Sequence, residues 1–326
     1  MQKVRWGLVS TARINLKVIP AILQSKRGEL VAVASRSKIK AEAYARQYKI
    51  PHAFGSYQAM FESGEVDAVY ISLPNHLHAE WSMRAMEAGL HVLCEKPFAT
   101  TLQDMDEAIA VKEQTGMALA EAFMYRHHPQ THIVREFIRS GDLGDISLMR
   151  GTFNFHLSKE DDTRLVPEWG GGCLWDVGVY PLSYAQFLMG EAPQKVIASQ
   201  VLGESGIDMH FNAQMWYSGG RTAQISSSFA LPFLTYVEVL GTQGRLYIDH
   251  PFTAINEGKV VFYPEKGRAR RLKVPKMYLY LGEIEDMQAA ILDGAPNLVT
   301  LEETRSHIKT TLALLKSAER GRVVGV

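Results

Sequence analysis

The chain has 326 residues, 46% hydrophobic and 21% charged, which excludes a disordered or fibrous protein and leaves room for two domains with separate cores. Lys plus Arg (35) equal Asp plus Glu (35), so no overall charge favours nucleic acid or a lipid surface, and we expect a small polar molecule as the partner. Two cysteines cannot build a disulfide framework, and the chain has neither a secretory apolar start nor an apolar run near the roughly 20 residues that span a bilayer. We therefore expect a cytoplasmic protein.

Strands and helices alternate over the first 122 residues. Residues 4–9 are typical of a short buried strand, a tight turn follows at residues 10–12, and the next apolar side chains recur at helical spacing. The pattern predicts strands at residues 4–9, 30–34, 53–54, 68–73, 91–94 and 118–122, and helices at residues 14–22, 38–48, 57–61, 78–88 and 103–115. This alternation predicts a doubly wound parallel sheet, which makes residues 1–122 a dinucleotide-binding Rossmann domain.

The pattern changes after about residue 125, where segments of period-two hydrophobicity follow one another without helices between them. Predicted strands lie at residues 146–155, 195–202, 209–217, 221–229, 236–240, 244–248 and 260–263, and predicted helices at 129–140, 179–188, 282–293 and 302–319. Residues 123–326 are therefore expected to form an α+β substrate domain with a large open mixed or antiparallel sheet. Its last helix is a candidate to pack back on the first domain. Because such a sheet must cover a second apolar face, we expect a homo-oligomer, a dimer or a tetramer, that pairs through it.

Ligands bind beyond the carboxyl ends of the strands in a doubly wound sheet. The first such loop departs from the glycine-rich dinucleotide fingerprint, because Ser10, Ala12 and Asn15 stand where glycines and a small residue are usual. Its small side chains still allow close backbone approach, and the start of the following helix favours a pyrophosphate. The cofactor contacts expected here are Ser10, Thr11, Ala12, Arg13 and Ile14. A plain turn before a helix is the alternative.

The second loop carries Ser35, Arg36 and Ser37, where an NAD site would place a carboxylate on the ribose hydroxyls. A guanidinium between two hydroxyls suits a 2′-phosphate instead, because these donors match phosphate oxygens. The three residues therefore predict NADP as the cofactor, with NAD as the second choice. A solvated arginine in a surface loop is the alternative interpretation.

Four further motifs carry a resemblance to a known family. Glu95, Lys96 and Pro97 directly follow the strand at residues 91–94, and Leu-Pro-Asn-His-Leu-His follows the preceding strand at residues 73–78. Residues 121–129 (EAFMYRHHP) and 170–181 (GGGCLWDVGVYP) complete the set. In combination these motifs resemble the glucose–fructose oxidoreductase, inositol dehydrogenase and MocA-type (Gfo/Idh/MocA) family over essentially the whole chain. The resemblance is closest to its dimeric dihydrodiol dehydrogenase and NADP-dependent xylose dehydrogenase branch.

Lys96 is the first catalytic candidate. The resemblance implies that it reaches the nicotinamide and the substrate, and that Pro97 follows a cis peptide. A lysine held before a proline at a strand end can also polarise a substrate hydroxyl or stabilise an alkoxide, and a solvent lysine is the alternative. The further cofactor contacts expected at the crevice are Leu73, Pro74, Asn75, His78, Glu95, Lys96 and Pro97. The resemblance adds Trp169 and the glycines at 170–172 beside the nicotinamide, with a flexible linker as the alternative.

Asp176 and Tyr180 are four residues apart at the start of a predicted helix, so they share one face and can point at one substrate. Similar enzymes place catalytic residues here. A phenol is a weak acid, but a nearby ammonium such as that of Lys96 favours the phenolate and makes it a usable base. We expect Tyr180 to exchange the substrate proton, Lys96 to assist it and Asp176 to orient the substrate. A capping aspartate and a packing tyrosine are the alternatives.

Polar side chains are expected to line the substrate pocket. They are Lys96, Arg126, His156, Asp176 and Tyr180, with Arg164 as a weaker candidate. For Arg126, His156 and Arg164 a structural salt bridge or a surface position is the alternative. Such a set suits a molecule with several hydroxyls. The histidines at 127, 128, 132 and 156 lack the spacing of a familiar metal site, and we expect no metal.

These observations predict an NADP-dependent dehydrogenase or reductase. It would transfer a hydride between nicotinamide and a hydroxyl-bearing carbon of a sugar (an aldose or pyranose) or of a cyclic trans-diol. Two alternatives stay open, an NAD(P)-binding regulatory protein without turnover and a non-redox enzyme that uses tightly bound NAD. The presence of Lys96 and Tyr180 argues against the first, and cofactor retained without net redox change would indicate the second.

Overall fold

The computed structural model describes residues 2–159, 161–253 and 259–326. These residues group into two compact units, Met1–His127 with Tyr278–Arg305 and His128–Met277 with Ser306–Val326. The chain therefore passes from one unit to the other three times, whereas the sequence pattern predicted a single boundary after residue 122.

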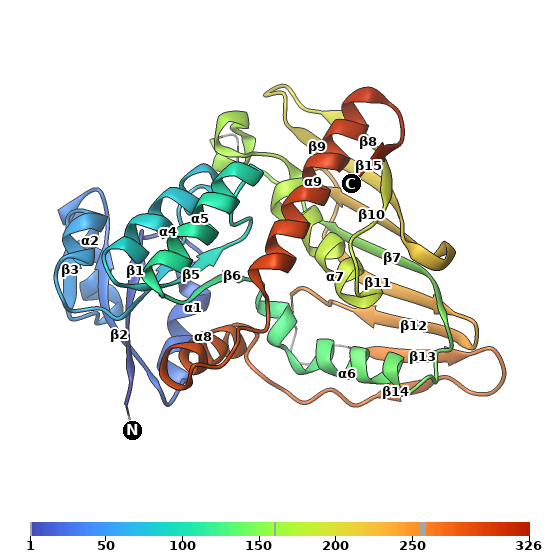
Figure 1. Ribbon diagram of the computed structural model, residues 1–326, viewed down its shortest axis with the longest axis horizontal. Coiled ribbons are helices and arrows are strands. Elements are labelled where there is room, and N and C mark those ends of the chain that lie inside the picture. Colours follow the sequence, from blue (N-terminus) through green and yellow to red (C-terminus); the bar gives the residue numbers. More distant parts are fainter. Residues whose placement is uncertain (1, 160, 254–258) are drawn as a thin grey trace. The chain divides into compact units, whose positions relative to one another are not determined.

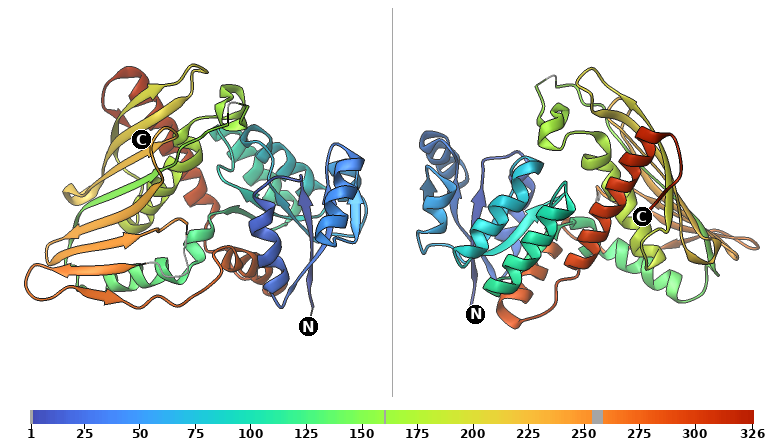
Figure 2. Two further views of the ribbon diagram at one scale, coloured as in Figure 1. Left: turned by 180° about the vertical axis from the view of Figure 1, so that it is seen from behind. Right: turned by 45° about the horizontal axis from the view of Figure 1, so that its top comes forward.

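The first unit contains a six-stranded sheet in the order β3-β2-β1-β4-β5-β6 (Figure 1). Its strands are β1 (Val4–Val9), β2 (Gly28–Ala34), β3 (His52–Phe54), β4 (Ala68–Ile71), β5 (His91–Glu95) and β6 (Leu119–Ala122). Its helices are α1 (Asn15–Gln24), α2 (Lys38–Tyr48), α3 (Tyr57–Phe61), α4 (His78–Glu87), α5 (Leu102–Thr115) and α8 (Leu281–Asp293). Every described strand pair is parallel, and helices cover both faces, α4 and α5 on one and α1 and α8 on the other (Figure 2). The predicted doubly wound sheet is confirmed.

Apolar side chains from both ends of the chain fill the core of the first unit. Trp6 of β1 is fully buried, and α1 presents Val18 and Ile22 to the same cluster at helical spacing. Ile284 and Met287 of α8 belong to this cluster as well. Residues 1–127 alone would therefore expose part of their core to water.

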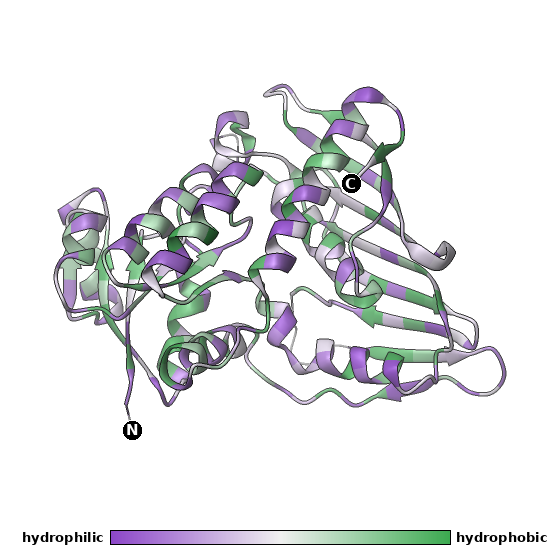
Figure 3. Cartoon of the chain, in the orientation of Figure 1, coloured by the Kyte–Doolittle hydropathy of each residue, from purple (hydrophilic) through white to green (hydrophobic). Residues whose placement is uncertain are grey.

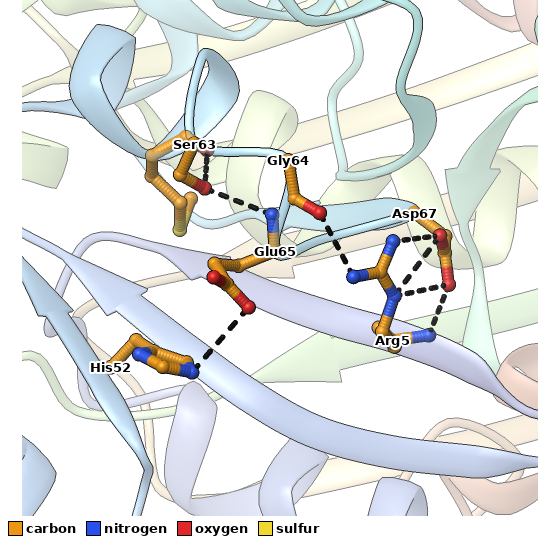
Figure 4. Close-up of polar contacts among 7 residues, drawn as sticks. Arg5, His52, Ser63, Gly64, Glu65 and Asp67 are labelled. Atoms are coloured by element: carbon orange, nitrogen blue, oxygen red, sulfur yellow. Dashed lines mark hydrogen bonds and ion pairs between the residues drawn. The ribbon is translucent and has the colours of Figure 1, made fainter.

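Exposed ion pairs tie the strands together at the amino-terminal edge of this sheet (Figure 4). Arg5 of β1 donates from Nη2 to Oδ1 of Asp67 at 2.7 Å and from its backbone N to Oδ2 at 2.8 Å. Its Nη1 donates to the carbonyl of Gly64 at 2.9 Å. Nearby, His52 Nε2 lies 3.6 Å from Oε2 of Glu65. Because Asp67 directly precedes β4, the Arg5 pair joins the starts of two neighbouring strands.

The second unit contains a nine-stranded mixed sheet in the order β14-β13-β12-β11-β7-β10-β9-β8-β15. Its strands are β7 (Ile146–Asn154), β8 (Lys195–Leu202), β9 (Asp208–Trp216), β10 (Thr222–Ser228), β11 (Leu234–Gly241), β12 (Gly244–Asp249), β13 (Val260–Pro264), β14 (Arg270–Leu272) and β15 (Val324–Gly325). β7 and β10 pair in parallel, and the other described pairs are antiparallel. The predicted large mixed sheet is confirmed, with two short edge strands, β14 and β15, that the pattern did not predict.

Helices cover one face of this second sheet. They are α6 (Pro129–Arg139), α7 (Val179–Met189) and the part of α9 (Leu301–Arg320) that follows residue 305, all in front of the strands in Figure 1. Gly151 of β7 permits the close approach of α7, since a Cβ there would lie 2.8 Å from the Cβ of Pro181. Nearly every residue of α7 is buried as a result.

The other face of the second sheet is uncovered (Figure 2), and hydrophilic and hydrophobic residues alternate along its strands (Figure 3). Arg150 Nε donates to Oε1 of Gln224 at 3.3 Å across neighbouring strands, and the hydroxyls of Thr152 and Ser226 hydrogen-bond to each other. Polar side chains therefore occupy part of the face that the sequence analysis expected to be apolar. Period-two patterns assign alternate residues to opposite faces, and here these outward residues are polar.

Candidate active site

The loops after β1, β2, β4 and β5 leave the carboxyl-terminal edge of the six-stranded sheet and are called the first to the fourth loop. The strand order reverses between β1 and β4. In the first loop Ser10 has a φ of +108°, a conformation that glycine usually supplies. The hydroxyls of Ser10 and Ser72 lie 2.9 Å apart, and Asn15 Nδ2 donates to the carbonyl of Ser10 at 2.9 Å. Ser72 in turn donates to Oδ1 of Asn15 at 2.8 Å. This network of Ser10, Asn15 and Ser72 holds the loop in the absence of the usual glycines.

The start of α1 fits an anionic group. Ile14 makes no side-chain capping bond, and the first turn contains no acidic residue. The backbone N–H groups of Asn15, Leu16 and Lys17 already donate to the carbonyls of residues 12–14 at 3.1, 3.1 and 2.8 Å, so an anion would meet the turn before the helix, where the helix dipole still favours it. Thr11 and Ala12 are half-buried, and Arg13 is exposed beside them. The loop can hold the pyrophosphate of a dinucleotide.

Arg36 is exposed in the second loop, which follows β2. No carboxylate among the described residues forms an ion pair with it, and its charge lowers the pKa of Tyr57, which burial raises more strongly. The flanking hydroxyls order the loop, because Ser35 Oγ accepts from the backbone N of Ser37 at 3.3 Å and Ser37 Oγ caps α2 through the backbone N of Lys40 at 3.4 Å. The three residues fit a phosphate, with Arg36 as the charged group.

His78 joins the third loop to the fourth. It is the first residue of α4 and only 1% exposed, which lowers its pKa to about 4. Its Nε2 lies 2.7 Å from the carbonyl of Leu73 and its Nδ1 lies 2.8 Å from the carbonyl of Pro97. Both ring nitrogens therefore face the backbone, although the sequence predicted a cofactor contact. Pro74 and Asn75 are half-buried in the third loop, and His76 after them is exposed.

The fourth loop contains Lys96 and the cis Lys96–Pro97 peptide that the resemblance implied. Lys96 is half-buried, and its backbone N donates to Oε2 of Glu95 at 3.3 Å. The other oxygen of Glu95 accepts from the buried hydroxyl of Tyr70. Glu95 is therefore engaged with its own unit and braces the start of the turn.

Glu121 of β6 is a residue whose role the sequence did not reveal. It is 3% exposed, and its two oxygens accept from the backbone N of Phe98 at 2.9 Å and from the hydroxyl of Thr304 at 2.8 Å. Burial raises its pKa to about 7, against these hydrogen bonds and the charge of Lys96, which lower it. The one available signal was a glutamate inside an otherwise apolar strand.

Asp176 lies on a π-helical turn (Leu174–Gly178) that precedes α7, whereas the sequence predicted an α-helix here. Such turns are uncommon and frequent at functional sites. Arg164 Nε donates to Oδ2 of Asp176 at 2.7 Å, and its Nη1 donates to Oδ1 of Asp162 at 3.1 Å. The charge of Asp176 is the main reason that the pKa of Arg164 is raised. Arg164, a weak substrate candidate, is thus a partner of Asp176.

Tyr180 lies in the first turn of α7 and is 6% exposed. Its ring centroid is 5.4 Å from that of Phe153 and 5.6 Å from that of Phe252. The rings of Phe153 and Phe252 stack at 5.9 Å. This aromatic wall orients the phenol and excludes water from its ring.

Asp208 explains the glycine run before the π-helical turn. It is 4% exposed, and its Oδ2 accepts from the backbone N of Leu174 at 2.7 Å and from Sγ of Cys173 at 3.1 Å. Gly172 has a φ of +118°, and a Cβ there would lie 2.0 Å from Oδ1 of Asp208. The glycine is therefore required by the chain itself, while Trp169, 39% exposed, ends the short helix before it.

Two predicted substrate contacts have different surroundings. Arg126 belongs to the first unit, is 3% exposed and pairs with Oε1 of Glu303 at 3.0 Å. His156 follows β7 in the second unit and is exposed. Burial raises the pKa of both cysteine thiols, Cys94 and Cys173, which disfavours their ionisation.

Within residues 2–159, 161–253 and 259–326, no three His, Cys, Asp or Glu side chains are grouped so that they could hold a metal ion. Over the same ranges no helix has the length and apolar character needed to cross a membrane.

Comparison with known proteins places both units. Residues 4–123 match the model of an oxidoreductase family with an NAD-binding Rossmann fold, and residues 131–247 match the Gfo/Idh/MocA C-terminal domain. A D-xylose 1-dehydrogenase (NADP(+)) of Haloferax volcanii is 37% identical over 98% of each chain. A trans-1,2-dihydrobenzene-1,2-diol dehydrogenase of Xenopus laevis is 30% identical over 78% of this chain and 79% of its own.

Solved structures agree with these matches. The aldose-aldose oxidoreductase of Caulobacter crescentus, complexed with glycerol, superposes with a TM-score of 0.92 at 26% identity over 100% of both chains. The 3-ketoreductase KijD10 of Actinomadura kijaniata, complexed with NADP and TDP-benzene, gives 0.91 at 29% identity over 97% of this chain and 98% of its own. With both family models matched and a relative 37% identical along its length, the chain belongs to the Gfo/Idh/MocA family of NAD(P)-dependent oxidoreductases.

Proposed function

We propose that the protein is an NADP-dependent oxidoreductase that acts on a hydroxyl-bearing carbon of a sugar or a cyclic trans-diol. The observation that carries the proposal is the Lys96 turn, braced by buried groups at the edge of a dinucleotide-binding sheet where ligands of such sheets bind. The relatives support the substrate class, since their names include a xylose dehydrogenase, a dihydrodiol dehydrogenase and an aldose-aldose oxidoreductase.

NADP is the proposed cofactor. Arg36, exposed and without an ion-pair partner in the described part of the chain, would hold the 2′-phosphate together with Ser35 and Ser37. The Haloferax relative is named for NADP(+), and the KijD10 structure contains NADP. The pyrophosphate would bind at the start of α1, at Ser10, Thr11, Ala12, Arg13 and Ile14. When bound, the nicotinamide accepts or supplies the hydride.

Tyr180 is the proposed general acid and base. In the oxidative direction its phenolate takes the proton from the substrate hydroxyl, and in reduction its hydroxyl returns it. Lys96 would favour the phenolate and hydrogen-bond to the reacting oxygen, because an ammonium stabilises negative charge on both. In KijD10, structures have been solved of variants that replace one lysine or one tyrosine, the same two residue types.

Asp176 would orient the substrate by accepting a hydrogen bond, with its carboxylate held by Arg164. Pro74, Asn75 and Trp169 would border the nicotinamide. Arg126 is buried and pairs with Glu303, which favours a structural role in the first unit. His156 is exposed and stays a candidate substrate contact.

Two broader features belong to the same proposal. The uncovered face of the nine-stranded sheet would pair with a second copy through hydrogen bonds as well as aromatic contacts, since Tyr236 and Tyr247 stack there at 5.9 Å.

The two unbridged, buried cysteines support a reducing, cytoplasmic setting.

Initial rates of nicotinamide reduction test the proposal. We would measure them with NADP and with NAD across pentoses, hexoses, inositols and a trans-dihydrodiol, for the wild type, Tyr180→Phe and Tyr184→Phe. Tyr184 is a matched control because it lies on the same helix and against the same Phe252 ring, at 5.8 Å. We expect turnover with NADP, a loss of about 100-fold or more in Tyr180→Phe and little change in Tyr184→Phe. Tight NADP binding without turnover on any substrate would instead indicate a regulatory or non-redox protein.

A further inference from the structure

Two buried side chains hold one peptide group of the Lys96 turn from its two ends. The carbonyl of Pro97 faces Nδ1 of His78 at 2.8 Å, and the N–H of Phe98 donates to Oε1 of Glu121 at 2.9 Å. The carbonyl and the N–H belong to the same peptide unit, the first one after the cis Lys96–Pro97 bond. We propose that His78 and Glu121 are positioning residues that fix this peptide unit and thereby the place of the Lys96 ammonium.

Each of the two side chains also contacts a second element. Nε2 of His78, on α4, lies 2.7 Å from the carbonyl of Leu73. Glu121, on β6, accepts from the hydroxyl of Thr304 on α9 at 2.8 Å. A neutral imidazole has one N–H, and the tautomer with the proton on Nδ1 is the one that donates to Pro97. Glu121 cannot move without breaking its bond to α9, and His78 is confined between two loop carbonyls, so the peptide unit is held between α4 and β6.

Burial makes this arrangement stiff. His78, Glu121 and Thr304 are 1%, 3% and 0% exposed, so water cannot replace a lost partner. Phe98, next in the chain, is fully buried too and fixes the far side of the turn. Lys96 itself is only half-buried, so the rigid part of the turn ends at the residue proposed to meet the substrate.

The charged and titratable groups that act on this pair are few. Lys96 and His76 act on His78, and Lys96 and Glu95 act on Glu121. The charge of Lys96 acts on both, lowering the pKa of each. Displacement of the peptide would move that charge relative to the substrate, and misplacement of about 1 Å can cost about 100-fold in rate.

A double-mutant experiment separates positioning from mere folding. The variants are Glu121→Met, which keeps the side-chain volume without an acceptor, and Glu121→Gln, which keeps an oxygen for Phe98. Both are made in the wild type and in Lys96→Met, and kcat is measured with the fastest substrate of the panel together with NADPH affinity by nicotinamide fluorescence. Ser82→Ala is the matched control, because its hydroxyl donates to the backbone carbonyl of His78 at 2.7 Å in an equally buried site.

We expect Glu121→Met to lower kcat about 10-fold to 100-fold in the wild type but about twofold or less in Lys96→Met, with NADPH affinity changed less than about threefold. Glu121→Gln should restore most of the rate, His78→Asn should behave like Glu121→Met, and Ser82→Ala should change little. Equal losses in both backgrounds would overturn the proposal, since the effect would not act through Lys96. The proposal rests on the proposed function, and a Lys96→Met enzyme with unchanged kcat would overturn the role of Lys96 there and the positioning role with it.

Discussion

The two edges of the six-stranded sheet are built from different kinds of interaction. At the amino-terminal edge Arg5 and Asp67 pair in water, with side chains 41% and 35% exposed. At the carboxyl-terminal edge Asn15, His78 and Glu121 are buried and bond to loop backbone or to buried side chains. Exposed pairs contribute little because water competes for each partner, whereas a buried polar group is costly to leave unpaired. The edge proposed to bind the cofactor is therefore the one whose loops are held most firmly.

The two edges should respond to pH in opposite directions, and Glu121 gives the larger effect. Its pKa in the folded state is about 7, above the ordinary carboxyl value, so its contribution is fully present below about pH 4.5 and lost as pH rises through 7. Glu121→Gln stays neutral throughout. Urea unfolding at pH 5 and pH 8 should show the wild type losing about 2.5 kcal/mol relative to Glu121→Gln. A constant difference would contradict a raised pKa for Glu121.

The network of the first loop gives the next largest effect. Asn15→Ala leaves the carbonyl of Ser10 and the hydroxyl of Ser72 without Asn15 and should destabilise the protein by about 2 kcal/mol. Affinity for NADP should fall as well, because the loop is no longer held in its turn. Gln58→Ala, which breaks an exposed bond to Glu62 of 2.7 Å in the same unit, serves as the control and should change neither quantity measurably.

Arg36 should affect cofactor choice without affecting stability. Arg36→Ala removes the proposed partner of the 2′-phosphate and should weaken NADP binding about tenfold, or about 1.4 kcal/mol. Affinity for NAD should stay unchanged. Titration of both cofactors by fluorescence, with the nearby exposed Lys40→Ala as the control, decides the matter. An equal loss for NADP and NAD would remove Arg36 as the phosphate contact.

The smallest effect is expected at the amino-terminal edge. Arg5→Ala should cost about 1 kcal/mol or less at neutral pH and leave cofactor affinity unchanged. Burial alone would raise the pKa of Asp67, but the hydrogen bonds and charge of Arg5 lower it below its usual value. The contribution of the pair is therefore present above about pH 4 and disappears as pH falls through the lowered pKa. A loss equal to that of Asn15→Ala would erase the contrast between the edges.

The fold followed closely from hydrophobic periodicity. The helices at 38–48 and 57–61 and the strands at 4–9 and 195–202 have the predicted bounds, because each has a clear apolar pattern between turn residues. β14 and β15, with three and two residues, are too short to show any period. The place of α8 in the first unit depends on packing between residues far apart in sequence, which no local pattern records.

Residues of the candidate site could be predicted where they belong to a recognisable motif, but isolated residues could not. The cis Lys96–Pro97 bond followed from the resemblance, and Arg36 from its position after a strand. Glu121 was missed because a lone carboxylate in an apolar strand has no spacing to detect, and Asp208 because it lies just before the predicted strand at residues 209–217. Ser10 shows the reverse case, since its backbone takes a glycine-like conformation that the residue type hides.

β14, the outermost strand beside β13, bears on how the protein behaves at high concentration. Its residues Arg270 and Arg271 are exposed, and Lys273 follows directly. An open sheet edge can recruit strands from other molecules, and short length and positive charge are features that oppose this. Arg270 pairs with Asp142, but Arg271 and Lys273 would still meet their like charges if two copies approached through this edge. The edge therefore resists the addition of further strands, which protects the folded enzyme against fibrous aggregation.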